Sequence, residues 1–183
     1  MRELSLHILD VVQNSLTAEA SIVNINIYES PLSNFLRIEI GDNGKGIAPD
    51  KIRKVIDPFY TTRTSRKVGL GLSLFKAAAE RSGGDFSIQS QPGSGTAVVA
   101  TFKYDDIDRA PLGNMPDTIL SLVIGNPAVD FCYRHRFEEN VFVFDTRELS
   151  RYISRSVLES PVVAVEIREY LSKAISKLQE NRS

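Results

Sequence analysis

Apolar and polar residues divide the first hundred positions into segments of helical and of strand character. Apolar side chains recur every three to four residues over 3–18, which predicts an amphipathic helix. They alternate in part with polar side chains over 22–28 and again over 35–40, which predicts two strands paired as a hairpin. The chain is therefore expected to open with a helix followed by a β-hairpin.

Two more helices and two more strands are predicted before the middle of the chain. A proline at the start of 49–55 favours a short helix there. The Leu- and Ala-rich segment 69–81 predicts a longer helix that a glycine pair ends. Segments 86–90 and 96–102 are predicted as strands joined by a tight turn. This order predicts an α+β fold, a two-layer α/β sandwich with helices on one face of a mainly antiparallel sheet.

The second half of the chain has a different pattern. Residues 105–116 are acidic, then contain Pro and Gly, and are predicted as a linker between a domain at 1–104 and a small α+β C-terminal domain at 117–183. The expected elements are strands over 118–124, 128–135 and 141–144, a helix from Asp145 or Thr146 to about Leu158, and a helix from Ser160-Pro161 onward. Their apolar faces suit packing on the first domain or a homodimer contact.

Composition narrows the class of protein. The 183 residues carry 22 Lys and Arg against 23 Asp and Glu, a net charge of −1, so no nucleic-acid partner is expected. One Cys and two His disfavour a disulfide framework and a Cys- or His-based metal site. The sequence has no export signal and no apolar run long enough for a membrane span, so a cytoplasmic protein is expected.

Candidate chemistry begins on the first helix, where His7, Asp10, Asn14 and Thr17 fall on one face. A carboxylate and an amide four residues apart can hold a hydrated Mg²⁺ and orient a water molecule. A stripe that simply faces solvent is the alternative explanation of the same spacing. His7 is expected at a pocket rim or in solvent, and His135 is expected at the surface.

Nine of the 11 glycines lie between positions 41 and 95. Asp42, at the end of a predicted strand, is followed by Gly44 and Gly46, which would let a planar ligand approach the backbone. An ionised carboxylate only accepts hydrogen bonds, so Asp42 could accept one from the exocyclic amino group of adenine. An ordinary Asp-Asn-Gly turn is the alternative.

Two further segments are suited to a polyphosphate. Loop 57–68 has three cations within five residues and many hydroxyl groups. Gly69-Leu70-Gly71-Leu72 opens a helix, where free backbone N–H groups and the helix dipole attract an anion. A solvated charged loop and a chance pair of glycines are the alternatives.

These segments, taken together and in this order, resemble the sequence boxes of the GHKL ATPase superfamily over about residues 1–104. Its Bergerat nucleotide-binding fold occurs in DNA gyrase, MutL mismatch-repair proteins and sensor histidine kinases. The similar motifs are Asp10-Val-Val-Gln-Asn14 for the N box, Asp42-Asn-Gly44-Lys-Gly46-Ile47 for the G1 box, Asp57-Pro-Phe59-Tyr60-Thr-Thr-Arg63 for the F box, Gly69-Leu70-Gly71-Leu72 for the G2 box, and Gly93-Ser-Gly95-Thr96 for the turn before the last strand.

The resemblance implies ATP and Mg²⁺ as cofactors and assigns a role to each matching residue. Asp10 would act as general base, Asn14 would coordinate Mg²⁺, and Asp42 would bind the adenine amino group. The other implied nucleotide contacts are Gly44, Gly46, Ile47 and Thr96 around the adenine, Gly69, Leu70, Gly71 and Leu72 at the phosphates, and Phe59, Arg63, Arg66 and Lys67 in the ATP lid.

Three departures from the family pattern shape the expected activity. The family usually has Glu in place of Asp10, whose side chain is one methylene shorter. Lys67 stands where the kinase G2 box usually begins with another glycine. Only six residues precede His7, so the phosphoacceptor hairpin of a sensor kinase is not expected. The leading hypothesis is a stand-alone kinase-like protein that transfers phosphate from ATP to a partner protein; a slow ATPase and a non-catalytic nucleotide sensor are the alternatives.

Overall fold

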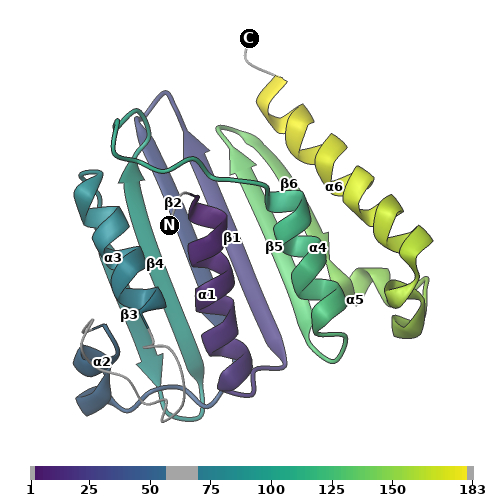
Figure 1. The fold of residues 1–183 in the computed structure, drawn as a ribbon, viewed down its shortest axis with the longest axis horizontal. Coiled ribbons are helices and arrows are strands. Elements are labelled where there is room, and N and C mark those ends of the chain that lie inside the picture. Colours follow the sequence, from purple (N-terminus) through teal and green to yellow (C-terminus); the bar gives the residue numbers. More distant parts are fainter. Residues whose placement is uncertain (1–2, 57–69, 181–183) are drawn as a thin grey trace.

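A computed structural model describes residues 3–56 and 70–180 of the chain (Figure 1). Six strands form one sheet in the order β3-β4-β2-β1-β5-β6. The strands are β1 (Ile22–Ser30), β2 (Phe35–Asp42), β3 (Phe86–Gln91), β4 (Gly95–Lys103), β5 (Asp130–Phe137) and β6 (Asn140–Asp145). Neighbouring strands are antiparallel except β1 and β5, which pair in parallel.

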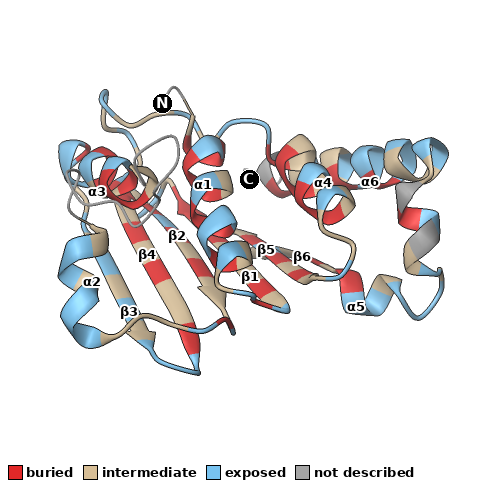
Figure 2. Ribbon diagram, turned by 60° about the horizontal axis from the view of Figure 1, so that its bottom comes forward, coloured by how far each residue is buried: buried red, intermediate tan, exposed pale blue. Residues whose placement is uncertain are grey.

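The longer helices lie on one face of this sheet, as the two ribbon views show (Figures 1 and 2). The helices are α1 (Leu4–Thr17), α2 (Pro49–Val55), α3 (Gly71–Arg81), α4 (Met115–Gly125), α5 (Thr146–Leu149) and α6 (Pro161–Glu180), with a 3₁₀ turn at Arg155–Glu159. The predicted α+β fold with its two-layer sandwich is therefore confirmed.

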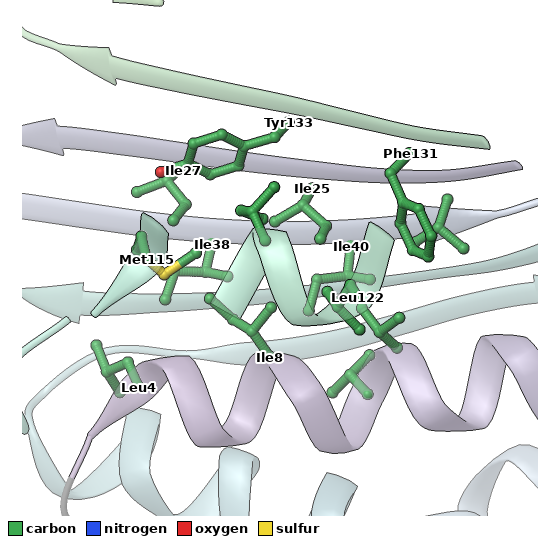
Figure 3. Packing of buried hydrophobic residues seen from close by; sticks show 14 of the residues in the cluster. Leu4, Ile8, Ile25, Ile27, Ile38, Ile40, Met115, Leu122, Phe131 and Tyr133 are labelled. Atoms are coloured by element: carbon green, nitrogen blue, oxygen red, sulfur yellow. The ribbon is translucent and has the colours of Figure 1, made fainter. Parts of the chain in front are cut away.

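Alternating burial explains why the sheet has one covered face. Alternate residues of β1 and β2 are buried, and their apolar side chains point toward the helices. Figure 3 shows Ile25, Ile27, Ile38 and Ile40 of these strands gathered over Ile8 of α1. Each such fully buried side chain stabilises the fold by about 1.5–3 kcal/mol relative to exposure. The core thus fixes α1 across the central strands.

Two local contacts hold the end of α1 beside the end of β2. Glu19, with φ of 59°, reverses the chain after α1, and the Ala20 N–H donates to the Ser15 carbonyl at 3.1 Å. The side-chain oxygen of Asn43 accepts hydrogen bonds from the N–H groups of Ser21 and Ile22, both at 2.9 Å. These contacts join the helix exit, the start of β1 and the loop after β2 at one end of the sheet.

The strand predicted over 118–124 is wrong, because these residues belong to helix α4. Its apolar run suggested a strand, yet the side chain of Asn114 accepts from the Asp117 N–H at 3.1 Å, and a proline stands in the first turn. The buried residues of α4 follow a three-to-four-residue period: Met115, Thr118, Ile119, Leu122 and Val123. Helical capping and periodicity therefore outweigh the β-branched content of the segment.

The helix predicted from Asp145 or Thr146 to about Leu158 is correct only at its start. Asp145 caps α5 by accepting from the Arg147 N–H at 2.9 Å, but α5 ends at Leu149. The Arg155 guanidinium donates to the Pro127 carbonyl and to Asp130 Oδ1, both at 2.7 Å. These contacts hold the chain against the start of β5, where it forms a 3₁₀ turn instead of a continuous helix.

Residues 117–183 contribute to the same sheet and the same buried cluster as the first hundred residues. The segment predicted as a linker packs on α1, whose Leu4 and Ser5 N–H groups donate to the carbonyls of Pro111 and Leu112 at 2.9 and 2.8 Å. The division into 1–104, 105–116 and 117–183 stays a sequence-based prediction. Within the described ranges, no helix combines the length and apolar character that a bilayer crossing requires.

Candidate functional site

Asp42 lies at the end of β2, where three donors from separate parts of the chain meet its carboxylate. The Ser15 hydroxyl of α1 donates to Oδ2 at 2.7 Å. The Gly44 N–H donates to Oδ1 at 2.8 Å, and the Thr96 N–H of β4 donates to the same oxygen at 3.3 Å. The carboxylate is therefore held in one orientation by α1, the loop after β2, and β4.

Ser90 of β3 links that strand to the residues around the Asp42 carboxylate. Its hydroxyl lies 2.8 Å from the Thr96 hydroxyl, accepts from the Ile47 N–H at 2.7 Å and donates to the Gly95 carbonyl at 2.9 Å. The loop that carries Ile47 is thereby fixed against the β3–β4 hairpin. Sequence analysis grouped Thr96 and Ile47 with Asp42, and the structure brings all three to one end of the sheet.

Glycine is required where the loop after β2 approaches other backbone. Gly46 has a φ of +69°, and a Cβ there would lie 2.0 Å from the Gln91 carbonyl oxygen. A Cβ on Gly44 would lie 2.7 Å from the Ala18 carbonyl oxygen. A Cβ on Gly95 would lie 1.8 Å from the Asp42 carbonyl oxygen. The glycines of this site permit close packing of three chain segments around the Asp42 carboxylate.

The exposed face of α1 contacts the beginning of α3 beside the residues that surround Asp42. Asp10 and Asn14 are both exposed and lie one helical turn apart on α1. A Cβ on Gly71 would lie 2.9 Å from the Asp10 Cβ, so the two helices touch at these residues. Within the described ranges, the Asn14 side chain makes no hydrogen bond. The carboxylate and the amide are therefore both present on the surface that adjoins the start of α3.

Helix α3 begins at Gly71, preceded by Leu70 in a helical conformation. The backbone N–H groups of its first turn have no partner inside the helix and favour an anion. The Leu72 side chain belongs to the buried cluster, so its contribution to a ligand would come from the backbone. Five expected contacts lie outside the described residues: Phe59, Arg63, Arg66, Lys67 and Gly69.

Both expectations for the histidines are wrong. The His7 ring is buried and stacks on Phe75 of α3, with ring centroids 5.2 Å apart, because the face of α1 that carries it turns toward α3. Burial lowers the His7 pKa to about 4, and its Nδ1 has no hydrogen-bond partner among the residues that the structure describes. His135 is buried on β5, where its Nε2 lies 2.7 Å from Glu29 Oε1 and its Nδ1 lies 2.8 Å from the Tyr133 hydroxyl.

Two site residues were missed by sequence analysis, Ser15 and Ser90. Ser15 had a detectable signal, since it continues the buried stripe of α1 seven residues after Ile8, where a hydroxyl needs a partner. Ser90 had none, because its role depends on how the β3–β4 hairpin folds against the loop that carries Ile47.

The donor set fits a magnesium nucleotide better than a metal held by protein alone. The described part of the chain has no group of three His, Cys, Asp or Glu side chains that could hold an ion. Mg²⁺ bound with a nucleotide needs only one or two protein oxygens, the rest coming from phosphates and water. The exposed Asn14 amide can supply such an oxygen, and the start of α3 can supply N–H donors.

Comparison with known proteins agrees with this architecture. A sensor-like histidine kinase of Rhizobium meliloti is 44% identical over 77 residues, 39% of this chain and 15% of the kinase. The sensor histidine kinase DcuS of Escherichia coli K12 is 38% identical over 71 residues, 39% of this chain and 13% of DcuS. The sensor protein kinase WalK of Staphylococcus aureus is 34% identical over 91 residues, 47% of this chain and 22% of WalK. The matched regions thus span less than a quarter of each kinase.

A solved structure extends the similarity of fold beyond the first hundred residues. The N-terminal domain of a DNA repair protein superimposes with a TM-score of 0.57 at 18% identity, covering 78% of this chain and 52% of that one. The family model of the histidine kinase-, DNA gyrase B-, and HSP90-like ATPases matches residues 2–106. The chain therefore belongs to this ATPase family, and its first hundred residues form a histidine-kinase-like ATPase domain.

Proposed function

We propose that the chain binds ATP with Mg²⁺ at the end of the sheet marked by Asp42 and transfers the terminal phosphoryl group to a partner protein. The observation that carries the proposal is the number of hydrogen bonds that the Asp42 carboxylate accepts. Within residues 3–56 and 70–180 it accepts three hydrogen bonds, from Ser15, Gly44 and Thr96, whereas a carboxylate has about four acceptor sites. One acceptor position is thus left for a ligand donor, and the adenine amino group is the donor that this family of ATPases suggests.

The proposed pocket uses backbone to fit the purine. The glycines at 44 and 46 bring the loop after β2 close to α1 and to the β3–β4 hairpin without side chains in the way. The Thr96 and Ser90 hydroxyls add polar contacts beside the carboxylate. Ile47 is held in place by the Ser90 hydroxyl, and its side chain would cover the adenine face.

The phosphates would follow from the adenine toward the contact between α1 and α3. Leu70 and Gly71 would offer N–H groups at the start of α3, and Asn14 would supply one oxygen to Mg²⁺. The metal would neutralise charge on the phosphate oxygens. Asp10, which adjoins Gly71, would accept the proton from an incoming hydroxyl or imidazole of the partner, while Arg63, Arg66 and Lys67 would approach the phosphates from the lid.

A second candidate function rests on the length of the Asp10 side chain. Aspartate is one methylene shorter than the glutamate that the family usually has, and this limits its reach toward an attacking water. The chain would then bind nucleotide and turn it over slowly or not at all, acting as a switch. Asp10→Glu would raise the rate of phosphate release in that case, and would leave transfer to a partner unimproved if the kinase proposal is correct.

Calorimetric titration of the purified chain with ATP and MgCl₂ tests nucleotide binding. Asn14→Ala should weaken binding at least about ten-fold in the presence of Mg²⁺ and much less in EDTA, a loss of about 1.4 kcal/mol or more. Gln13→Ala is the matched control, since it removes an exposed side-chain amide from the position just before Asn14 on α1. The proposed metal contact is refuted if both variants bind ATP equally well.

Transfer is tested by incubation with γ-labelled ATP and a cell extract. Label on a second protein, absent with Asn14→Ala, supports the kinase proposal. Free labelled phosphate alone supports slow hydrolysis, and tight binding without either product supports a nucleotide sensor. Each of the last two outcomes would overturn the proposed phosphoryl transfer.

A further inference from the structure

The outer edge of β6, three strand spacings from β2 in the sheet, borders cavities lined by apolar and charged side chains. β6 is the last strand in the order of the described sheet, so its outer backbone groups have no strand partner in that part of the chain. Two cavities follow this edge, one of about 460 Å³ along Val143–Asp145 and one of about 290 Å³ along 140–142. Together they border all six residues of the strand.

Helix α6 forms the opposite wall, and Figure 1 shows it running beside β6 at the end of the sheet. Tyr170 of α6 lines the larger cavity and meets the Phe142 ring edge to face, with centroids 5.6 Å apart, so one aromatic pair stands between the two cavities. The larger cavity is mainly apolar, with Leu149, Ile153 and Val163 among its walls. Val141 and Val143 of β6 are 50% and 43% exposed, a large apolar surface for an edge strand, and Tyr170 of α6 is 55% exposed.

The two cavities between β6 and α6 together form a groove, which we call the β6 groove. Its two ends differ in charge. Asp145, Glu148 and Glu166 line the larger cavity, and Lys177 lines the smaller one. Asp145 pairs with Arg147 and Glu148 pairs with Arg151. Within the described ranges, Glu166 forms no ion pair, so its carboxylate is available to a ligand. Glu166 thus makes the Asp145 end of the groove acidic, and Lys177 makes the other end basic.

We propose that the β6 groove binds an extended segment of a partner protein, which adds to the sheet as a strand beside β6. Backbone hydrogen bonds to the free edge would supply affinity, and every second side chain would enter the cavities. The segment would carry apolar residues at alternate positions, a Lys or Arg that meets Glu166, and an Asp or Glu that meets Lys177. At about 3.3 Å per residue, six residues would span the strand.

The strand register gives this surface a relation to the nucleotide site. Asp145 pairs with Cys132, Cys132 with Asn24, and Asn24 with Gly41, the residue before Asp42. The Asp145 end of the groove therefore lies at the same end of the sheet as Asp42, three strand spacings away, or about 14 Å. A protein held in the β6 groove could extend from there toward the nucleotide, although binding in the groove does not require nucleotide.

Fluorescence anisotropy with synthetic peptides tests the proposal. The probes are fluorescein-labelled peptides of about eight residues in which Val and Ile alternate with polar residues, with Lys at one end and Glu at the other, in both orders. One order should bind at least about ten-fold more tightly than a peptide of the same composition without alternation. Hydrogen exchange should then show new protection at the amides of β6.

Variants of α6 locate the peptide. Glu166→Lys and Tyr170→Ala should each weaken binding several-fold, whereas Glu169→Lys, the same charge change on an exposed position outside the cavities, should not. Circular dichroism confirms that each variant folds. Equal effects of Glu166→Lys and Glu169→Lys, or no preference for alternating peptides, would overturn the proposal. Dimerisation of the chain that Val143→Lys abolishes would also overturn it, since the occupant would then be a second copy.

Discussion

The buried imidazole of His7 makes the stability of the fold depend on pH. His7 stacks on Phe75 between α1 and α3, and burial, aided by the charge of Arg81, lowers its pKa from 6.5 to about 4. The unfolded chain therefore holds a proton on this residue below about pH 6.5, and the folded chain holds one only below about pH 4. Unfolding takes up a proton between these values, so acid favours the unfolded state.

The size of the effect follows from the two pKa values. Stability is fully present above about pH 6.5, falls as the pH drops toward 4, and changes no further from this residue below 4. Each unit corresponds to about 1.4 kcal/mol, so the full loss is about 3 kcal/mol, and the loss between pH 7 and pH 5 is about 2 kcal/mol. Such a change is a large share of the stability of an ordinary domain.

Urea unfolding followed by circular dichroism at several pH values between 5 and 8 measures this loss. His7→Phe keeps a ring against Phe75 and removes the titrating group, so the difference between wild type and variant isolates His7 from all other groups. The wild type should lose about 2 kcal/mol more than the variant between pH 7 and pH 5. Parallel pH profiles would refute the reasoning, as would a proton NMR titration of wild-type His7 with a pKa near 6.5, which needs no variant.

Other substitutions test single features of the fold. Gly46→Ala should lower the free energy of unfolding by about 1–3 kcal/mol in urea titrations, because of its positive φ and the clash of a Cβ, while Gly41→Ala, with nothing within 4 Å, should cost less. Tyr133→Phe should cost about 1–3 kcal/mol by leaving the buried Nδ1 of His135 without its partner, measured by the same titrations; a neutral result would refute the importance of that bond. Asn114→Ala should lower the thermal midpoint by removing a helix cap of about 1 kcal/mol, and an unchanged midpoint would contradict the capping argument.

Periodicity in the sequence predicted the first half of the fold because its helices and strands are amphipathic on a single covered face. The alternation over 22–28 and 35–40 reappears as the alternating burial of β1 and β2. It failed over 118–124, where apolar residues fill nearly every position and the period is hard to see. In that segment the capping residue Asn114 and the proline after it indicate a helix, whereas hydrophobicity alone does not.

The candidate site was predicted where chemistry is local in sequence and missed where it depends on folding. Asp42 and Gly44 lie two positions apart and form a hydrogen bond that an Asp-x-Gly turn makes by itself. The Ser15 donor, 27 residues away, was missed because its contact requires the sheet and α1 to be in place. The Thr96 donor, 54 residues away, was expected at the site only through the resemblance to the family. The buried Glu29–His135 pair joins β1 to β5 over 106 residues, so neither sequence neighbourhood could show it.

The most direct test of the proposed nucleotide site compares ADP with inosine diphosphate by calorimetric titration of the wild-type chain. Inosine carries an oxygen where adenine carries the amino group, so it would direct an acceptor at the Asp42 carboxylate. If the remaining acceptor position of Asp42 recognises adenine, ADP should bind at least about ten-fold more tightly, and Asp42→Asn should remove most of this preference. Equal affinity of the wild-type chain for both nucleotides would contradict the account.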